Sequence, residues 1–260
     1  MKQPRRIAVK VGSNVLTRPD GRLDISRMAA LVDQIAELHR RGIQVMLISS
    51  GAVASGRGAL PEIQDDSVTG RQLFAAVGQA KLIEHYCDLF REYGITVGQI
   101  LTTRENFTNR QLLANQRRCM KAMIDNNVVP VINENDAVSV KELMFTDNDE
   151  LSGLVAGMMK AELLVLLSNV DGVYDGNPAD SSSQLIRMVY TDDDFSSCVS
   201  QTKSQFGRGG MMTKMKTARS VARDGIEVRI ANGRRNDVLL DVVFNPDTAL
   251  CTRFLTVKRK

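Results

Sequence analysis

The sequence predicts an α/β fold with an open, mostly parallel sheet and helices on both of its faces. Short runs rich in β-branched and other apolar residues recur along the chain without a clean two-residue alternation. Such runs are typical of strands buried on both faces. Stretches with apolar residues at helical spacing lie between them. Strand and helix therefore alternate, which indicates parallel strands joined by helical crossovers.

The individual elements can be placed along the chain from these patterns. Strands are expected at residues 7–11, 43–48, 95–101, 128–132, 163–167 and 228–230. Helical patterns cover residues 28–38, 73–90 and 112–124. Gly42, Gly94 and Gly225 stand where a helix must end before the next strand, and we expect them to be C-terminal helix stops.

Ligands in such sheets gather beyond the carboxyl ends of the strands. The turns that follow Val11, Ile48, Ile132 and Leu167 are all polar or contain glycine. These four turns are therefore where we expect the chemistry to take place.

Composition excludes several classes of protein. The chain has 260 residues, of which 43% are apolar and 25% charged, and its formal net charge of +4 is spread along the sequence. This is typical of a globular protein and is weak evidence for a nucleic-acid partner. The four cysteines are far apart, and no apolar run approaches the roughly 18 residues of a membrane-spanning helix. We expect a cytoplasmic protein with neither an export signal nor a membrane anchor.

The domain organisation is expected to be simple. Residues 1–260 are predicted to form one domain, with a division near residue 160 into a half that binds an amino acid and a half that binds a nucleotide. Residues 177–183 are the most linker-like stretch and indicate a surface loop rather than a domain boundary.

Lys10 lies in the first apolar strand, directly before a turn that contains Gly12. A lysine in such a strand needs an anionic partner. A phosphate would serve, because Gly12 lets backbone N–H groups approach its oxygens. A lysine that extends to solvent from a strand edge is the alternative on this motif alone.

Ser49, Ser50 and Gly51 end the second strand and open a short helix of small residues. The N–H groups at the start of this helix can bind an anion, although the serines could instead cap the helix. The glycine spacing in residues 51–58 is not that of a P-loop, since the required Lys and Ser/Thr are missing.

Two turns near mid-chain are rich in asparagine and aspartate, at residues 133–136 and 147–149. The second precedes an apolar helix that is expected to begin near Leu151. Helix capping would explain one of these residues but not all of them. A polar ligand that carries an ammonium group is favoured, and a divalent cation is the competing interpretation.

A glycine-rich loop at residues 207–210 leads into a helical pattern that holds Lys214 and Lys216. Such loops bind phosphates, and a lysine in the first turn can neutralise charge on a phosphoryl group that is being transferred. A flexible connector is the alternative.

Taken with their strands, these turns resemble those of the amino-acid kinase family, and specifically its members that phosphorylate the γ-carboxylate of glutamate. The resemblance runs essentially from end to end. The combination of Ile132–Asp136 with the Gly-Gly-Met sequence at 209–211 is the most specific part of it. The segments that carry the resemblance are residues 9–13, 49–52, 75–79, 129–136, 147–149, 171–174 and 209–214.

The resemblance implies a three-layer αβα sandwich of the amino-acid kinase type, with ATP and Mg²⁺ as cofactors. It implies that Lys10 and Lys214 stabilise the transferred phosphoryl group and that Asp149 orients these two lysines. Metal ligands among the residues are not identified. The residues implied to bind the amino acid are Ser50, Gly51, Asn133, Asp136 and Asn148. Those implied to bind ATP are Lys10, Gly12, Ser168, Asn169, Arg208, Gly209, Gly210, Met211, Met212, Thr213 and Lys214.

Three residues depart from the family pattern, namely Asn169, Arg208 and Met212. They affect nucleotide contacts more than the type of reaction. The chain is also expected to be a short form of the family that lacks a C-terminal RNA-modification-type (PUA) domain.

The resemblance further implies a homodimer or tetramer, and a product that is handed to a glutamyl-phosphate reductase. The helix expected around residues 71–93 carries apolar residues on more than one face, which a subunit interface or ordinary core packing would explain. A sister kinase acting on N-acetylglutamate, aspartate, carbamate or a nucleoside monophosphate is the nearest alternative. A non-catalytic amino-acid sensor with this fold is the alternative from another class.

Overall fold

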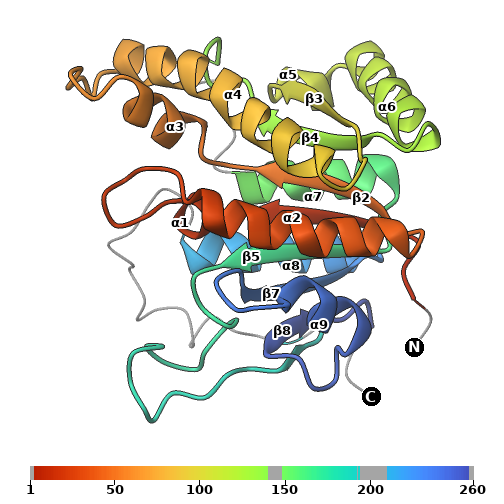
Figure 1. Cartoon of the computed structure of the whole chain (residues 1–260). Coiled ribbons are helices and arrows are strands. Elements are labelled where there is room, and N and C mark those ends of the chain that lie inside the picture. Colours follow the sequence, from red (N-terminus) through yellow and green to blue (C-terminus); the bar gives the residue numbers. More distant parts are fainter. Residues whose placement is uncertain (1–2, 140–147, 192, 194–209, 258–260) are drawn as a thin grey trace. The chain divides into compact units, whose positions relative to one another are not determined.

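A computed structural model describes residues 3–139, 148–191, 193 and 210–257 (Figure 1). The chain folds into two compact units. One covers residues 11–145 and is here called the 11–145 unit. The other covers residues 146–260 together with residues 1–10 and is called the 146–260 unit. The chain therefore returns to its first strand to complete the second unit.

The 11–145 unit contains three parallel strands. They lie in the order β3, β4, β2, with Gly98 of β3 opposite Pro130 of β4, and Ile132 of β4 opposite Ile48 of β2. The bounds are β2 (Gln44–Ser49), β3 (Val97–Thr102) and β4 (Val129–Glu134).

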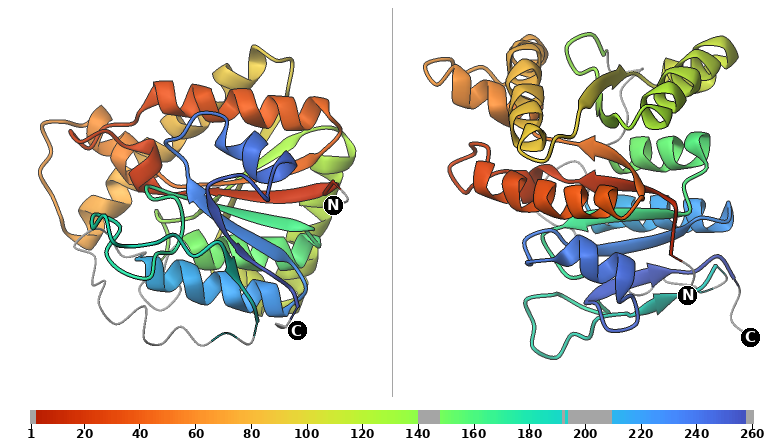
Figure 2. Two further views of the ribbon diagram at one scale, coloured as in Figure 1. Left: turned by 90° about the horizontal axis from the view of Figure 1, so that it is seen from below. Right: turned by 45° about the vertical axis from the view of Figure 1, so that its right-hand side comes forward.

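Helices cover both faces of these strands. Helices α2 and α4 lie on one face and α6 on the other (Figure 2). Side chains cap the longer helices, since Asp24, Ser67 and Asn109 each accept a hydrogen bond from an N–H of the first turn. The bounds are α1 (Ser13–Leu16), α2 (Ile25–Arg40), α3 (Ala52–Ala59), α4 (Val68–Arg91), α5 (Glu105–Thr108) and α6 (Arg110–Asp125).

The 146–260 unit contains strands in the order β1, β5, β7, β8, β6. Strands β5 and β7 are parallel, as are β6 and β8, whereas β7 and β8 are antiparallel. Helices α7 and α8 lie on one face and α9 on the other (Figure 2). The strand bounds are β1 (Arg6–Val11), β5 (Leu163–Ser168), β6 (Met188–Val189), β7 (Glu227–Asn232) and β8 (Cys251–Phe254). The helix bounds are α7 (Asn148–Met159), α8 (Met211–Arg223) and α9 (Val238–Phe244).

The core confirms the fold class predicted from the sequence. Every residue of β4 and of β5 is buried, as expected for strands covered on both faces. The helix stops are also confirmed, because Gly42, Gly94 and Gly225 all have positive φ angles, of 78°, 65° and 88°. No helix in the described part of the chain is long and apolar enough to span a membrane.

Two features differ from the sequence prediction. Helix α7 begins at Asn148 and not near Leu151, because the polar residues before Leu151 form its first turn. Acidic residues are favourable there, next to the unpaired N–H groups of the helix. Five short elements were not predicted, because none of them shows a distinct period in the sequence: α1, α5, α9, β6 and β8.

Candidate active site

Three charged side chains of the 146–260 unit form a buried cluster. Lys10 Nζ lies 2.6 Å from Asp149 Oδ1, and Lys214 Nζ lies 2.9 Å from Asp149 Oδ2. These residues come from β1, α7 and α8, at distant points in the sequence. The side chain of Asp149 is 0% exposed, and those of the two lysines are below 10%. One carboxylate therefore holds two ammonium groups in place, and the cluster keeps a net positive charge.

The ionisation of Asp149 is fixed by its surroundings. Burial raises the pKa of a carboxyl group, but here the charges of Lys10 and Lys214 outweigh burial and hold the pKa of Asp149 below its ordinary value. Its place in the first turn of α7 also favours the negative form, since the helix N-terminus carries partial positive charge. Asp149 is thus an anion at neutral pH.

Helix α8 carries Lys214, one of the two lysines of this cluster, in its first turn. Gly210 precedes the helix and makes no side-chain cap, so backbone N–H groups at the helix start are available to a phosphate. Met212 is 55% exposed, which places its side chain away from the core. Arg208 and Gly209 of the predicted loop lie outside the described residues.

Ser168 and Asn169 lie at the carboxyl end of β5, as predicted. Ser168 is 7% exposed and its carbonyl accepts a hydrogen bond from Gly233 N–H, which follows β7. The turn after β5 is held by Arg235, whose Nε and Nη2 donate to the two carboxylate oxygens of Asp171 at 2.5 and 2.7 Å. This fork holds the loop after β5 against the loop after β7.

In the 11–145 unit, Ser49 and Tyr86 hold the turn after β2 in place. Ser49 Oγ donates to the Ser50 carbonyl at 3.0 Å and lies 2.8 Å from the hydroxyl of Tyr86 in α4. Burial raises the pKa of Tyr86 to about 12, so this hydroxyl stays neutral. Gly51 has a φ of 105° and caps α3, a conformation that a side chain would strain. Ser50 and Gly51 are both partly exposed, whereas Gly12, in the turn after β1, is buried.

The turn after β4 borders a hollow of about 300 Å³ within the 11–145 unit. Its polar wall includes the predicted residue Asp136 together with Glu134, and its other walls include small side chains of α3 and α4. Asn133 is 2% exposed and lies behind this wall, where its Nδ2 donates to Gln79 Oε1 at 2.8 Å. The hollow can therefore offer carboxylates to an ammonium group.

Asn148, the remaining predicted amino-acid ligand, is the first residue of α7 and is partly exposed. It is adjacent to Asp149 in sequence and belongs to the 146–260 unit. Asp147, from the same predicted turn, lies outside the described residues.

The described residues suit Mg²⁺ carried by a nucleotide better than Mg²⁺ held in a protein cage. They contain no group of three or more His, Cys, Asp or Glu side chains placed to hold a metal ion. Both oxygens of Asp149 are already engaged by lysines. Mg²⁺ commonly keeps its waters and binds phosphate oxygens.

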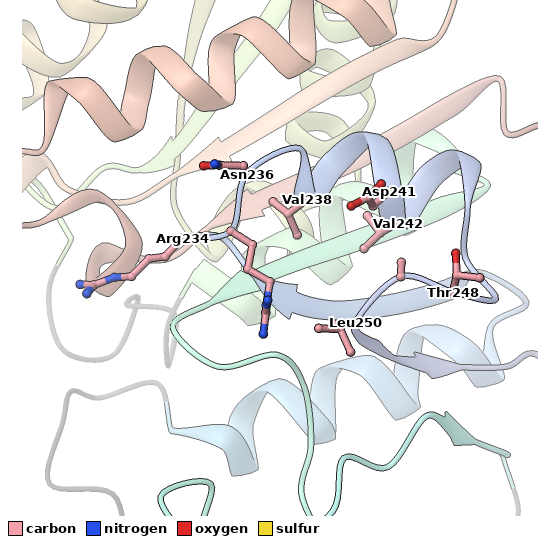
Figure 3. Close-up of a pocket in the computed structure, with 9 residues that line it drawn as sticks. Arg234, Asn236, Val238, Asp241, Val242, Thr248 and Leu250 are labelled. Carbon is pink, nitrogen blue, oxygen red and sulfur yellow. The ribbon is translucent and has the colours of Figure 1, made fainter.

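A second hollow, of about 570 Å³, lies in the 146–260 unit beside α9 (Figure 3). Val238, Asp241 and Val242 of α9 face Leu250 and Thr248 of the segment before β8 across it (Figure 3). None of the predicted site residues lines this hollow.

Two residues to which the sequence analysis gave no role of their own, Gln79 and Arg235, are connected by the structure to Asn133 and Asp171. Gln79 is a polar residue on the buried face of α4, where Ala75 and Leu82 repeat at helical spacing, and this break in the pattern was the available signal. Arg235 follows β7 in a polar turn, and nothing in the sequence indicated its pairing with Asp171.

Comparison with known proteins identifies the family. Residues 5–232 match the family model described as "Amino acid kinase family". The chain is 59% identical over 257 residues to a glutamate 5-kinase of Bacteroides thetaiotaomicron, a match that covers 98% of this chain and 71% of the relative. It is 43% identical over 261 residues to a glutamate 5-kinase of Chlorobaculum tepidum, with 98% of this chain and 70% of the relative covered.

A solved structure supports the fold independently. Carbamate kinase from Giardia lamblia, determined with AMP-PNP bound, superimposes with a TM-score of 0.68 at 15% sequence identity. The match covers 98% of this chain and 99% of that one. At this low identity the likeness shows the fold alone.

Proposed function

Because the chain belongs to the amino acid kinase family, and within it to the glutamate 5-kinases, we infer that it transfers the γ-phosphoryl group of ATP to the γ-carboxylate of L-glutamate. The product is L-glutamyl 5-phosphate, formed in the first step of proline biosynthesis from glutamate. The observation that carries this inference is the 59% identity over 98% of the chain. The buried cluster of Lys10, Asp149 and Lys214 supplies the chemistry that such a transfer needs.

The reaction needs placement and charge neutralisation rather than a general base. A glutamate side chain has a pKa of about 4.3, so the γ-carboxylate is already ionised at neutral pH. One of its oxygens attacks the γ-phosphorus of ATP, the bond from that phosphorus to the bridging oxygen breaks, and ADP leaves with the electron pair. The enzyme must therefore hold two anions in line and stabilise negative charge on the phosphoryl oxygens.

Lys10 and Lys214 are assigned this stabilising role. Their ammonium groups are fixed by Asp149 at 2.6 and 2.9 Å, so they need little reorganisation when charge develops. Asp149 is a positioning residue, since both of its oxygens face the lysines. Mg²⁺, held by phosphate oxygens and water, neutralises further charge on the nucleotide when it is bound.

The amino-acid end of the substrate is assigned to residues of three segments: the end of β4 with its turn, the turn after β2 and the start of α7. Asp136 offers a carboxylate to the ammonium group, and Asn133 supports the wall of the same hollow. An N-acetylated substrate has no ammonium group and would leave such a carboxylate without a cation, which favours a free amino acid. Ser50, Gly51 and Asn148 complete the proposed set.

The nucleotide is assigned to the turns after β1 and β5 and to the start of α8. The N–H groups at the start of α8 bind phosphate oxygens, and Lys214 lies one turn further along. Most of the residues assigned to the nucleotide belong to the proposed nucleotide half, after about residue 160, whereas Lys10 and Gly12 come from the start of the chain. The residues proposed to contact ATP are Lys10, Gly12, Ser168, Asn169, Arg208, Gly209, Gly210, Met211, Met212, Thr213 and Lys214.

Several broader properties are part of the proposal. The enzyme acts in the cytoplasm as a homodimer or tetramer, passes its unstable acyl phosphate to a glutamyl-phosphate reductase, and has no nucleic-acid or membrane partner. Within α4, Leu82, Tyr86 and Phe90 are buried in this chain, so their apolar character reflects core packing. Light scattering tests the assembly, and a monomeric mass would overturn it.

Substrate identity is tested by coupled ADP release with Mg-ATP and each of glutamate, N-acetylglutamate, aspartate and UMP. We expect ADP release with glutamate alone. Activity with another acceptor and not with glutamate would refute the proposed function. Calorimetry that showed glutamate or proline binding but no ATP binding would instead indicate a sensor.

The role of the lysines is tested by a matched pair on one helix. Lys214 is buried against Asp149, whereas Lys216 is exposed two residues away. Lys214→Met is expected to lower kcat by about 10²- to 10³-fold, because it removes a preorganised charge from the transferred group. Lys216→Met is expected to keep kcat within about twofold, and Lys10→Ala should behave like Lys214→Met. Equal effects of Lys214→Met and Lys216→Met would refute the assignment.

A further inference from the structure

Gln79 connects the wall of the 300 Å³ hollow to a predicted ligand of the substrate. It lies in α4, is 9% exposed, and lines the hollow. Its Oε1 accepts a hydrogen bond from Asn133 Nδ2 at 2.8 Å, and Asn133 is itself 2% exposed. The amide of Gln79 thus has one end against Asn133.

The orientation of both amides is fixed by the backbone. Glu134 N–H donates to Asn133 Oδ1 at 2.9 Å, and a backbone N–H can only donate. Asn133 must therefore turn its Nδ2 towards Gln79, and Gln79 must present Oε1 in return. The Nε2 group of Gln79 is left over, and none of the described residues accepts a hydrogen bond from it. Because Gln79 lines the hollow, its remaining N–H groups can reach a ligand bound there.

The hollow has the charges that an amino acid head group requires. Glu134 and Asp136 line it with carboxylates, and Gln79 and Gln99 line it with amides. In an α-amino acid the ammonium and the α-carboxylate are attached to the same carbon. An ammonium group placed near Asp136 or Glu134 therefore brings the α-carboxylate within the same small space, where it needs a hydrogen-bond donor.

We propose that Gln79 Nε2 donates a hydrogen bond to the α-carboxylate of the bound amino acid, and that Gln79 is a specificity-determining residue of the enzyme. This inference rests on the proposed function, in which the amino acid is L-glutamate. The γ-carboxylate is the reacting end of the substrate. Analogues that are blocked at the α-carboxylate keep this reacting end, so an enzyme can distinguish them from glutamate only at the α-carboxylate. Gln79 selects for an unmodified α-carboxylate.

Gln79→Glu separates this role from simple support of Asn133. The substitution is nearly isosteric and keeps an oxygen to accept from Asn133 Nδ2, but it turns a carboxylate towards the substrate. We expect KM for glutamate to rise at least about tenfold while KM for Mg-ATP stays within about twofold. If Gln79 only supports Asn133, the variant will keep the wild-type KM for glutamate, and the proposal is overturned.

A substrate analogue provides the second readout. In the α-amide of glutamate, an N–H donor takes the place of one carboxylate oxygen. The ratio of kcat/KM for glutamate to that for the α-amide should fall at least about tenfold in Gln79→Glu, because the new carboxylate accepts from the amide and repels the carboxylate. An unchanged ratio contradicts the proposal.

Gln79→Met carries the test if the charged variant does not fold. It removes the donor without adding charge, so we expect a smaller loss, of several-fold, in the same ratio. Thermal melting of each variant checks that the fold is intact. Calorimetric titration with glutamate measures binding without turnover, so a wild-type protein that binds glutamate but releases no ADP would refute the proposed function and leave Gln79 testable.

Discussion

Asp149 is the residue on which the proposed chemistry depends most. It has no contact with solvent, and each of its oxygens holds a different lysine. Removing it would leave two buried ammonium groups side by side, and breaking a buried pair in this way destabilises proteins by about 3–5 kcal/mol. The positions of Lys10 and Lys214 are therefore set by a carboxylate whose two oxygens both face these lysines.

The pairing of Asp149 makes stability depend on pH on the acidic side. Its pKa is lower in the folded protein than in the unfolded chain, so its contribution is present above the unfolded pKa, near 4, and is lost as pH falls through the folded pKa. We expect Asp149→Asn to be less stable at pH 7 and to lose less free energy of unfolding between pH 5 and pH 3 than the wild type does. Urea unfolding across this range measures both effects. Parallel pH profiles for the two proteins would contradict this account.

Arg235 holds Asp171, which lies in the loop after β5 that is proposed to contact the nucleotide. The guanidinium group lowers the pKa of Asp171, and the pair is about half exposed on the arginine side, at 48%. Since solvent weakens such pairs, we expect Arg235→Ala to raise KM for Mg-ATP only about two- to fivefold, with KM for glutamate unchanged. Arg234→Ala is the control, because the neighbouring side chain does not hold Asp171. If KM for glutamate changes instead, the Arg235–Asp171 pair does not act on the loop proposed to bind the nucleotide.

At this scale, the sequence indicated the residues whose chemistry is unusual for their position. Lys10 in an apolar strand needed an anionic partner, and the structure supplies Asp149. The roles of Gln79 and Arg235 were not found, because a single polar residue in a helix or a polar turn has many possible partners and only the tertiary fold selects one.

Helix α4 organises the 11–145 unit at the scale of elements. Three residues on its buried face reach three different parts of the 11–145 unit. Gly78 packs against α3, Gln79 accepts a hydrogen bond from Asn133 near the end of β4, and Tyr86 lies beside Ser49 at the end of β2. A shift of this one helix would displace all three.

The packing of α3 on α4 depends on close backbone approach. A Cβ atom at Gly78 would lie 1.8 Å from the carbonyl oxygen of Ala52, and one at Gly56 would lie 1.9 Å from that of Phe74. Such contacts cannot form unless the helices separate, because the neighbouring atoms are backbone and cannot turn away.

We therefore expect Gly78→Ala to lower the free energy of unfolding by about 3 kcal/mol and to raise KM for glutamate. Gly157→Ala is the control, since Gly157 also lies in a helix, in the last turn of α7, and a Cβ there meets no atom within 4 Å. That variant should be neutral or more stable by about 0.5–1 kcal/mol, because alanine favours helix. Urea denaturation of both proteins measures the difference, and equal stabilities would refute the close-packing argument.

Fully apolar strands and long helices with a strong period could be predicted, whereas short elements without either feature could not. In strands such as β5 and helices such as α2, the pattern of apolar residues indicates which residues are buried. Strand β8 pairs antiparallel with β7 through contacts that no local pattern encodes. The start of α7 was misplaced because Asn148 and Asp149 resemble a loop, although they form the first helical turn.

At the scale of the whole molecule, one compact unit is built from two separate stretches of the chain. Residues 1–10 group with residues 146–260, which places Lys10 in the same unit as Asp149 and Lys214. The predicted division near residue 160 was based on function and remains a proposal. The class of fold could be predicted because alternating strands and helices permit few arrangements. The inclusion of β1 in the 146–260 unit could not be predicted, since it depends on pairing between residues far apart in the sequence.

If the enzyme phosphorylates the γ-carboxylate of glutamate, its product is an acyl phosphate that hydroxylamine can trap. Hydroxylamine attacks the carbonyl carbon of an acyl phosphate, the bond to the phosphate oxygen breaks, and a hydroxamate forms as inorganic phosphate leaves. With Mg-ATP, glutamate and hydroxylamine, we expect γ-glutamyl hydroxamate in an amount equal to the ADP released. ADP release without hydroxamate, or no ADP release with glutamate, would contradict the account.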